Sequence, residues 1–356
     1  MHLLDPLKTH KKPVTIKDLA AELNLSITTI SRALNGYSDV GEKTRIRVRQ
    51  AAQKLGYHPN RNAQRLVTQR TQNIAWIQAD DDKKFVDPHF VEVMAGILRG
   101  ARIANYDIVM TSDTTEHQID VYNRFVQDNS VDGFIIDLPR HNDPRIDFLL
   151  ETGKPFIVHS RDERCDNYSW VDVDNPGNYY KLTRLLIANG HKKIAFLNGD
   201  ERFTFARARQ NGVNRALSEL GLPKETVTTL NARHPMANAG HQLTQRALED
   251  TKITAILYSS ALMAVEGQPA LIKAGREPGK NIAIATMDDV LNYLDLSPYE
   301  GLFTYVRSSL REAGAQLVSS LVLQCEDNSL HPQTVIPSKI ILAQDMDGQV
   351  LDTLQD

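Results

Sequence analysis

Residues 15–36 read TIKDLAAELNLSITTISRALNG, and this stretch decides how the front of the chain folds. Apolar residues recur at helical spacing on both sides of Asn24 and Leu25, which predicts two short helices joined by a tight turn. Thr15 and Ser26 stand where the two helices begin and are suited to N-capping. The pattern indicates a helix-turn-helix unit, although a pair of helices that only pack together would share it.

The second helix of this pair has an outward face of distinct chemistry. At 100° per residue, Thr28 and Arg32 point away from its apolar side, and Ile27 and Ser31 flank them. An arginine can form paired hydrogen bonds with guanine, a threonine can bond several bases, and an aliphatic group can contact the thymine methyl. We therefore expect this helix to enter a DNA major groove.

Charge is distributed unevenly along the 356 residues. Residues 1–70 contain 13 Lys and Arg against 5 Asp and Glu, whereas the remainder contains 28 against 39. A small basic head on an acidic body favours a polyanion as the partner of the head. A solubilising basic arm is the alternative, but the head is patterned and apolar enough to fold.

The composition is that of an ordinary globular protein, with 41% hydrophobic and 24% charged residues. No apolar run approaches the ~18 residues of a membrane helix, and the opening MHLLDPLKTHKK lacks the apolar region of a secretory signal. Cys165 and Cys325 are the only cysteines and do not have a metal-type spacing. We expect a cytoplasmic protein with reduced thiols and no membrane partner.

A third helix and a short basic segment follow the helix pair. The third helix is predicted at residues 42–55, with Gly56 as the residue that ends it. Residues 61–70 read RNAQRLVTQR, with three arginines and one large protruding apolar residue, Leu66. This segment is too short for a stable isolated helix, but a basic segment with an aliphatic wedge suits a DNA-kinking element in the minor groove. A plain linker is the alternative and would be richer in Gly, Ser or Pro.

From residue 72 onward, apolar strands alternate with amphipathic helices, which predicts parallel sheets buried on both faces. The alternation restarts after residue 177, so the body is predicted to form two doubly wound lobes with a cleft between them, where ligands bind at the carboxyl ends of strands. Strands are predicted at 73–79, 106–112, 131–137, 154–160, 192–198, 226–231, 254–260, 281–287 and 339–343. Helices are predicted at 90–105, 116–129, 143–152, 176–189, 207–220, 237–251, 262–274 and 308–326.

Motifs of common enzyme classes are missing from the sequence. There is no Gly-x-Gly-x-x-Gly after the first strand, no Walker pattern, no Gly-x-Ser-x-Gly and no His-Glu-x-x-His. We therefore expect no catalytic residue, no cofactor and no metal. An α/β enzyme fused to a DNA-binding head and a sugar-binding receptor are the competing interpretations.

Several motifs of this chain occur together in one family. They are VTIKDLA (14–20), SxxTISRALNG (26–36), LGYxPNxxAxxL (55–66), DPHF (87–90), VDG (131–133), NGHKKIAF (189–196) and the pair Asp288-Asp289. On these motifs nearly the whole chain resembles the lactose-repressor family of bacterial transcription regulators. Within that family, PFIVHSR (155–161) is most similar to regulators of α-glucoside or related disaccharide uptake.

The resemblance implies a transcription regulator, by family default a repressor, that binds a pseudo-palindromic operator in double-stranded DNA as a homodimer, with a tetramer left open. It makes Ile27 and Thr28 the main base readers and Arg32 the groove-facing arginine. It also makes residues 60–67 a hinge helix that kinks the minor groove with Leu66 as the wedge. The full set of implied DNA-binding residues is Thr15, Ser26, Ile27, Thr28, Thr29, Arg32, Asn35, Asn60, Ala63 and Leu66.

The body resembles periplasmic sugar-binding proteins, which implies a small effector between the lobes. A neutral polyol needs charged groups such as Arg209 and Asp288 and an aromatic face such as Phe90 or Phe203. A non-sugar metabolite is the alternative effector. The implied effector-binding residues are His89, Phe90, Ser160, Arg161, Phe205, Arg207, Arg209, Ser260 and Asp288.

Some of these positions depart from the family pattern. His89 replaces a more usual aromatic, Ser160 replaces an Asp, and Ser260 stands where Asn is frequent. Asp288 could instead cap the following helix, and Arg209 could pair with a surface acid.

The predicted organisation is a head at 1–58, a hinge segment at 59–71, a body at 72–346 and a tail at 347–356. Lobe one is predicted as 72–168 plus 305–332, and lobe two as 170–303 plus 334–346. Three crossings between the lobes make a hinge, so closure of the cleft is expected to order or melt residues 60–67.

Overall fold

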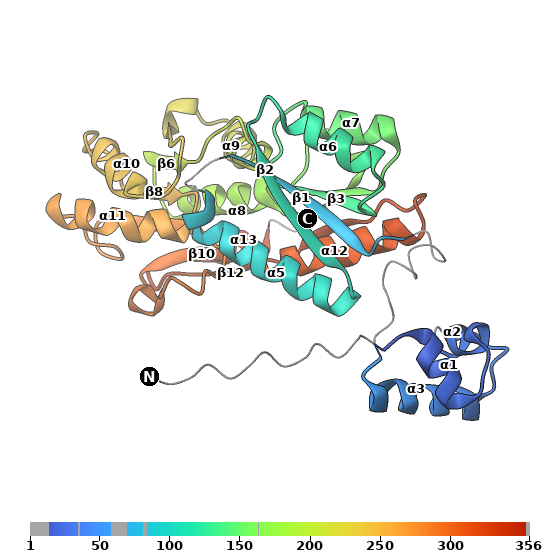
Figure 1. The fold of residues 1–356 in the computed structure, drawn as a ribbon. Coiled ribbons are helices and arrows are strands. Elements are labelled where there is room, and N and C mark those ends of the chain that lie inside the picture. The colour runs from blue at the N-terminus through green and yellow to red at the C-terminus, as the bar shows by residue number, and fades with distance from the viewer. Residues whose placement is uncertain (1–13, 35, 58–69, 81–83, 163, 354–356) are drawn as a thin grey trace, which may run out of the picture. The chain divides into compact units, whose positions relative to one another are not determined.

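The computed structural model describes residues 14–34, 36–57, 70–80, 84–162 and 164–353. The chain divides into two compact units, Met1–Thr71 and Gln72–Asp356 (Figure 1).

The described part of the first unit is helical, as predicted. It contains α1 (Ile16–Leu23), α2 (Ile27–Leu34) and α3 (Glu42–Leu55). Thr15 caps α1 in a capping box, in which the Thr15 side chain accepts from the Asp18 amide and the Asp18 carboxylate accepts from the Thr15 amide. Asn24 adopts the left-handed conformation with φ 51° and ends α1. The helices enclose a small apolar core of Leu19, Leu23, Ile30, Ala33, Val40, Val48 and Ala52.

The second unit contains two six-stranded sheets, one per lobe (Figure 1). Sheet one has the order β11-β5-β4-β3-β1-β2 and is parallel throughout. Its strands are β1 (Asn73–Ala79), β2 (Asp107–Asp113), β3 (Gly133–Ile136), β4 (Phe156–His159), β5 (Ser169–Val173) and β11 (Gln333–Ile336).

Sheet two has the order β12-β10-β9-β8-β6-β7, in which only the β10–β12 pair is antiparallel. Its strands are β6 (Ile194–Asn198), β7 (Val227–Asn231), β8 (Ala255–Tyr258), β9 (Ala283–Asp288), β10 (Phe303–Arg307) and β12 (Lys339–Ile341).

Helices cover both faces of each sheet, which explains the near-continuous apolar runs of the strands. Lobe one carries α5 (Pro88–Ala104), α6 (Gln118–Gln127), α7 (Pro144–Thr152) and α12 (Leu310–Glu326). Lobe two carries α8 (Asn175–Ala188), α9 (Thr204–Glu219), α10 (Ala239–Ala247) and α11 (Ala261–Lys273), and the short α13 (Gln349–Asp352) contacts α8. Consecutive residues of β1 are buried on opposite faces of the sheet, because Trp76 packs into one core cluster and Ile77 into the other.

Glycines allow α5 and α12 to cross closely. A Cβ added to Gly96 would lie 2.1 Å from the carbonyl oxygen of Arg311, and one added to Gly314 would lie 2.3 Å from that of Val93. No larger residue fits at either position without moving a helix, so the crossing holds the start of α5 in place.

The lobe boundaries differ from the prediction. Strands β5, β10 and β11 each complete the sheet that the chain is about to leave, so the chain crosses after Val173, Arg307 and Ile336. Strands β5 and β10 lie next to the edge strands β11 and β12, and no strand was predicted at residues 169–173, 303–307 or 333–336. The sequence pattern therefore did not reveal which sheet these segments join. The prediction assigned the wrong lobe to residues 170–173, 305–307 and 334–336.

Candidate DNA-binding and effector sites

Helix α2 presents the expected outward face. Ile27, Thr28 and Arg32 are all exposed, with 45% of Ile27 accessible. The hydroxyl of Ser26 accepts from the Thr29 amide at 3.0 Å and lies 2.8 Å from the Thr29 hydroxyl, so these two residues cap the helix. Thr15 likewise caps α1. Caps leave the backbone N–H groups at a helix start ordered, and such groups can also contact phosphate.

Arg32 is held by two neighbours in the loop that follows α2. Its Nε donates to Asp39 Oδ1 at 3.1 Å, and a terminal nitrogen lies 2.6 Å from Asp39 Oδ2. The guanidinium also lies 5.0 Å from the centre of the Tyr37 ring. The sequence prediction for the DNA-binding set did not include Asp39. Asn35, Asn60, Ala63 and Leu66, which it did include, lie outside the described residues.

In the body, the start of α5 carries His89 and Phe90. Phe90 is 7% exposed and stacks on Trp76 with ring centres 5.1 Å apart, so it packs in the core of lobe one. His89 lies at the lobe boundary, with Nδ1 2.8 Å from Asp87 Oδ1 and Nε2 3.5 Å from Asp289 Oδ2. Burial alone would lower the pKa of His89, but the hydrogen bonds and charges of Asp289 and Asp87 outweigh it and raise the pKa to about 10.

Two adjacent strands of sheet one end in ionisable residues. Asp137 follows β3, and its Oδ2 lies 2.7 Å from the buried ammonium of Lys84. Burial would raise the pKa of Asp137, but the charge of Lys84 lowers it below its usual value. His159 ends β4, and burial lowers its pKa. The predicted effector site did not include Lys84, Asp137 or His159. A polar residue at the end of a buried strand is a recognisable sequence signal of a ligand contact and could have identified Asp137 and His159.

Three described residues with buried polar atoms that have no partner lie at the carboxyl ends of strands. Among the described residues, no hydrogen bond reaches either amide atom of Gln78, Oδ1 of Asp137 or Oδ1 of Asn198. Gln78 is the next-to-last residue of β1, Asp137 follows β3, and Asn198 ends β6. Buried polar groups are nearly always paired, so Gln78, Asp137 and Asn198 are candidates for contacts with a ligand.

Two predicted effector residues, Arg161 and Arg209, are joined by a chain of polar side chains. Arg161 Nε lies 3.3 Å from Asp172 Oδ2, and its guanidinium lies 4.7 Å from the centre of the Trp170 ring. Asn175 donates to Asp172 at 3.1 Å and accepts from Arg209 Nε at 2.8 Å. Burial raises the pKa of Asp172 to about 7 despite the nearby arginine.

Arg209 also lies against aromatic rings. Its guanidinium is 5.4 Å from the centre of Tyr179 and 5.2 Å from that of Phe205, and Phe205 stacks on Phe203. The Asn175 amide and two aromatic rings therefore orient Arg209, which does not form the surface ion pair considered as its alternative role.

Ser160 connects the two lobes. Its hydroxyl lies 3.1 Å from that of Thr204 at the start of α9, and the Thr204 amide donates to the Pro139 carbonyl at 3.0 Å. Asn292, in the loop after β9, makes a similar connection, because its backbone N–H donates to the Glu92 carboxylate on α5 at 3.1 Å.

Ser260 and Asp288 have structural partners of their own. The Ser260 hydroxyl accepts from the Met263 amide at 3.3 Å and caps α11. Asp288 accepts from Arg307 Nε at 2.8 Å and from the Val290 amide at 3.0 Å. Of the two adjacent aspartates, Asp289 is the one that faces lobe one.

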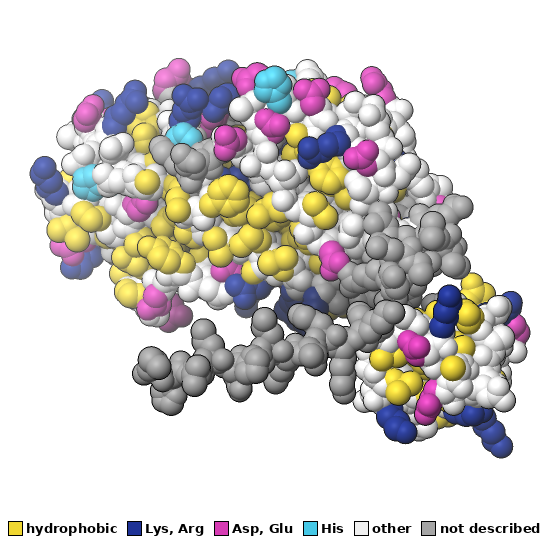
Figure 2. Space-filling view, viewed as in Figure 1, with side chains coloured by type: hydrophobic (Ala, Val, Ile, Leu, Met, Phe, Trp, Pro, Cys, Tyr) yellow, Lys and Arg dark blue, Asp and Glu magenta, His cyan; other side chains and the backbone are white. Residues whose placement is uncertain are grey.

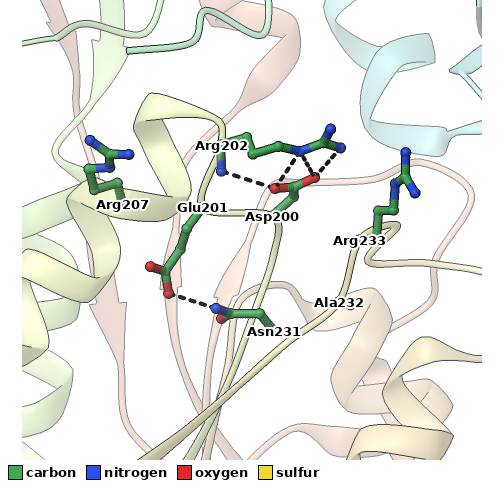
Figure 3. A pocket seen from close by; sticks show the side chains of 7 residues that line it. All are labelled: Asp200, Glu201, Arg202, Arg207, Asn231, Ala232 and Arg233. Atoms are coloured by element: carbon green, nitrogen blue, oxygen red, sulfur yellow. Dashed lines mark hydrogen bonds and ion pairs between the residues drawn. The ribbon is translucent and has the colours of Figure 1, made fainter.

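A separate depression of about 690 Å³ lies at the ends of β6 and β7 (Figure 3). Asp200 pairs with Arg202 at 2.6 Å, and Glu201 accepts from Asn231 at 2.8 Å. Arg207, a predicted effector residue, and Arg233 also line it and form no ion pair with the described residues. The described residues contain no group of three potential metal ligands and no helix that could cross a membrane.

Comparisons with known proteins agree with this arrangement. Residues 15–60 match the family model described as bacterial regulatory proteins, lacI family. Residues 71–342 match the model described as periplasmic binding proteins and sugar binding domain of LacI family.

Named relatives are transcription regulators and not enzymes. The chain is 38% identical over 312 residues to the HTH-type transcriptional regulator AglR of Rhizobium meliloti (strain 1021), covering 87% of each chain. It is 32% identical over 279 residues to RafR of Escherichia coli, covering 78% of this chain and 82% of that one.

The fold matches a solved structure of the lac repressor dimer bound to operator and the anti-inducer ONPF. The TM-score is 0.76 with 24% identity, covering 94% of this chain and 99% of that one. A CelR–cellobiose complex matches with a TM-score of 0.66 and 22% identity, covering 93% and 99%. This chain thus belongs to the lacI family of bacterial regulatory proteins and is a DNA-binding transcription regulator.

Proposed function

We propose that this protein is a cytoplasmic repressor that binds a pseudo-palindromic operator as a homodimer and changes its operator affinity when a small sugar binds between its lobes. The observation that carries the effector part is the set of unpaired polar atoms on Gln78, Asp137 and Asn198. Sugar hydroxyls both donate and accept, so they can satisfy an amide, a carboxylate oxygen and a second amide oxygen together.

The charged and aromatic groups nearby support a polyol. Arg209 and Arg161 present N–H donors that are oriented by Asn175 and Asp172. Phe205 lies beside Arg209 and offers an apolar surface for the C–H face of a sugar ring. A hydrophobic metabolite would leave the remaining N–H donors of these arginines without a partner, which supports a polar effector over a hydrophobic one.

The polar contacts between the lobes support a switch that works by cleft closure. Ser160–Thr204, His89–Asp289 and Glu92–Asn292 each join a residue of lobe one to a residue of lobe two. A ligand that binds more tightly when these contacts are formed shifts the protein toward the closed state. In a dimer, such a shift changes the spacing of the two DNA-binding heads and so changes operator affinity.

The size of the effector is proposed from the depression at the ends of β6 and β7. Arg207 and Arg233 line this depression, and neither forms an ion pair with the described residues. CelR, a similar structure, was solved with cellobiose. Both observations support a disaccharide, and the similarity of residues 155–161 to regulators of α-glucoside uptake makes an α-glucoside our first candidate.

An apolar surface supports the homodimer. Val91 and Leu98 lie seven residues apart on one side of α5 and are 41% and 52% exposed. Figure 2 shows apolar side chains gathered on the face of the body that carries α5. An apolar stripe of this kind is covered in a stable assembly, and the lac repressor is solved as a dimer.

The full-length protein tests the effector proposal. We expect a disaccharide to raise its melting temperature and to change its affinity for a selected palindromic operator, measured by fluorescence anisotropy. A panel of α- and β-linked disaccharides, their monosaccharides and charged metabolites separates the alternatives. A response to a charged metabolite alone would contradict the sugar proposal.

The minor-groove wedge is proposed from the sequence, because Leu66 lies outside the described residues. We expect Leu66→Ala to reduce operator bending and affinity while random duplex binds equally well. Energy transfer between dyes at the two ends of an operator fragment measures the bend. An unchanged bend angle would exclude Leu66 as the wedge.

A further inference from the structure

The contact between Arg32 and Asp39 has the geometry of a fork. Two nitrogens on one edge of the guanidinium, Nε and a terminal nitrogen, meet the two oxygens of a single carboxylate at 3.1 and 2.6 Å. The Tyr37 ring lies 5.0 Å from the guanidinium carbon. The arginine is thus constrained along one edge and across one face.

Stability of the head does not explain this contact. The two side chains are 45% and 53% exposed, and an ion pair in such a position contributes little to folding. A carboxylate beside a DNA-reading helix also repels phosphate and so weakens binding to any duplex. The effect of Asp39 must then fall on the direction and freedom of Arg32.

The edge that Asp39 leaves open matches a base. The free end of the guanidinium carries N–H groups of both terminal nitrogens: those of the nitrogen that Asp39 does not contact, and the remaining N–H of the nitrogen that it does contact. Guanine presents O6 and N7 in the major groove at the spacing of these two donors. An arginine whose inner edge is already bonded loses fewer rotamers when its end meets guanine.

We propose that Asp39 is a positioning residue for sequence reading, which orients Arg32 end-on toward one guanine of each operator half-site. This inference rests on the proposed role of Arg32 in base reading. Asp39 does not itself touch the base. It converts a flexible cation, which would otherwise bind any phosphate, into a directed pair of donors.

The test uses the full-length protein, a selected operator and versions of it in which each guanine of the half-site is replaced. Asp39→Asn keeps the shape but weakens the fork, and Asp39→Glu keeps the charge but displaces the carboxylate by one methylene. Glu22→Gln removes an exposed charge elsewhere in the head and is the matched control. Melting temperatures confirm that each variant is folded.

Discrimination is the ratio of the affinity for the operator to the affinity for the operator with one guanine replaced. We expect both Asp39 variants to lower this ratio about fivefold at one guanine, the same guanine at which Arg32→Ala lowers it. We expect Asp39→Asn and Glu22→Gln to bind random duplex more tightly by a similar factor, and Asp39→Glu to leave that affinity unchanged. The double variant Arg32→Ala/Asp39→Asn should discriminate no worse than Arg32→Ala.

The outcomes separate the two proposals. If Arg32→Ala loses discrimination and both Asp39 variants keep it, the positioning role is overturned while base reading by Arg32 stands. If Asp39→Asn tightens operator binding more than Glu22→Gln does, Asp39 competes with the base, and the inference is also overturned. If Arg32→Ala discriminates as well as wild type at every guanine, both proposals fail.

Discussion

His89 Nε2 lies 3.5 Å from Asp289 Oδ2, and the two residues belong to different lobes. His89 belongs to lobe one and lies at the start of α5, where its Nδ1 is 2.8 Å from Asp87 Oδ1. Asp289 follows β9 in lobe two. The raised pKa of His89 keeps the ring protonated at neutral pH, so this contact is a charged bridge across the cleft.

This bridge predicts a pH dependence with a definite sign. The folded pKa of about 10 lies above the usual 6.5, so the stabilisation is complete below pH 6.5 and is lost as the pH rises through about 10. Between pH 7 and pH 10.5, we expect the melting temperature of the wild type to fall by about 3 °C more than that of Asp289→Asn. Differential scanning fluorimetry across this range measures both.

The control for this prediction is Asp295→Asn, which changes an exposed carboxylate in the same loop that bonds to Ser297 and not to His89. It should follow the wild-type curve. Parallel curves for wild type and Asp289→Asn would show that Asp289 does not stabilise the charged form of His89, because Asp87 is present in both proteins.

A second prediction concerns Arg209. Its side chain is oriented by Asn175, Tyr179 and Phe205, and loss of a charged hydrogen bond to a ligand costs about 1.5–3 kcal/mol. We expect Arg209→Ala to weaken disaccharide binding by about tenfold or more, with unchanged operator affinity in the absence of sugar. Isothermal calorimetry measures the sugar affinity.

Arg215 provides the matched control, because it lies on the same helix, packs on Tyr180 and pairs with Glu219 at 3.7 Å. Arg215→Ala should bind sugar as the wild type does. Equal sugar affinities for Arg209→Ala and Arg215→Ala would remove Arg209 from the effector site.

Much of this fold was predictable from local signals. The capping box of Thr15 and Asp18 needs only residues three apart, and β1 was predicted with its observed bounds, 73–79. Buried strands and amphipathic helices have distinct periods, so the long helices and nine of the described strands could be recognised from their own residues, but β5, β10 and β11 were not predicted as strands. The sheet that a strand joins depends on a partner elsewhere in the chain, and most residues of β5, β10 and β11 were assigned to the wrong lobe.

The site was less predictable for the same reason. The family pattern pointed to Asp288, and its role as an effector contact stays a prediction. Its ion pair with Arg307 and the approach of Asp289 to the other lobe depend on the folded arrangement and were not foreseen. Asp39 is seven residues from Arg32, and the loop that joins them decides whether they meet. Unpaired atoms such as Oδ1 of Asp137 follow from three-dimensional packing, and no spacing along the chain reveals them.

A third prediction addresses the dimer. Leu98 is 52% exposed on the outer side of α5, and a carboxylate there would be buried unpaired in an interface. We expect Leu98→Glu to be a folded monomer in sedimentation velocity, with operator affinity reduced by at least about a hundredfold because one head alone binds a half-site. Leu150→Glu, a 41% exposed residue on α7, is the control and should sediment as the wild type. A dimeric Leu98→Glu would place the interface elsewhere.

The fourth prediction sets stability against function at Gln78. This side chain is fully buried in β1, and neither its amide oxygen nor its amide nitrogen has a partner among the described residues. An unpaired buried amide costs about 1–3 kcal/mol. We expect Gln78→Met, which is similar in volume, to stabilise the sugar-free protein by about 1 kcal/mol in chemical denaturation and to weaken sugar binding by about tenfold.

Gln324 is the matched control for this substitution. It is also buried, but its Oε1 accepts from the Ser169 hydroxyl at 3.0 Å. Gln324→Met should therefore destabilise the protein, because Ser169 loses its acceptor, and should leave sugar affinity unchanged. Opposite signs of the two stability changes would mean that the Gln78 amide is kept for a ligand at the expense of folding. A loss of stability in Gln78→Met equal to that in Gln324→Met would show that Gln78 serves the fold and not the effector.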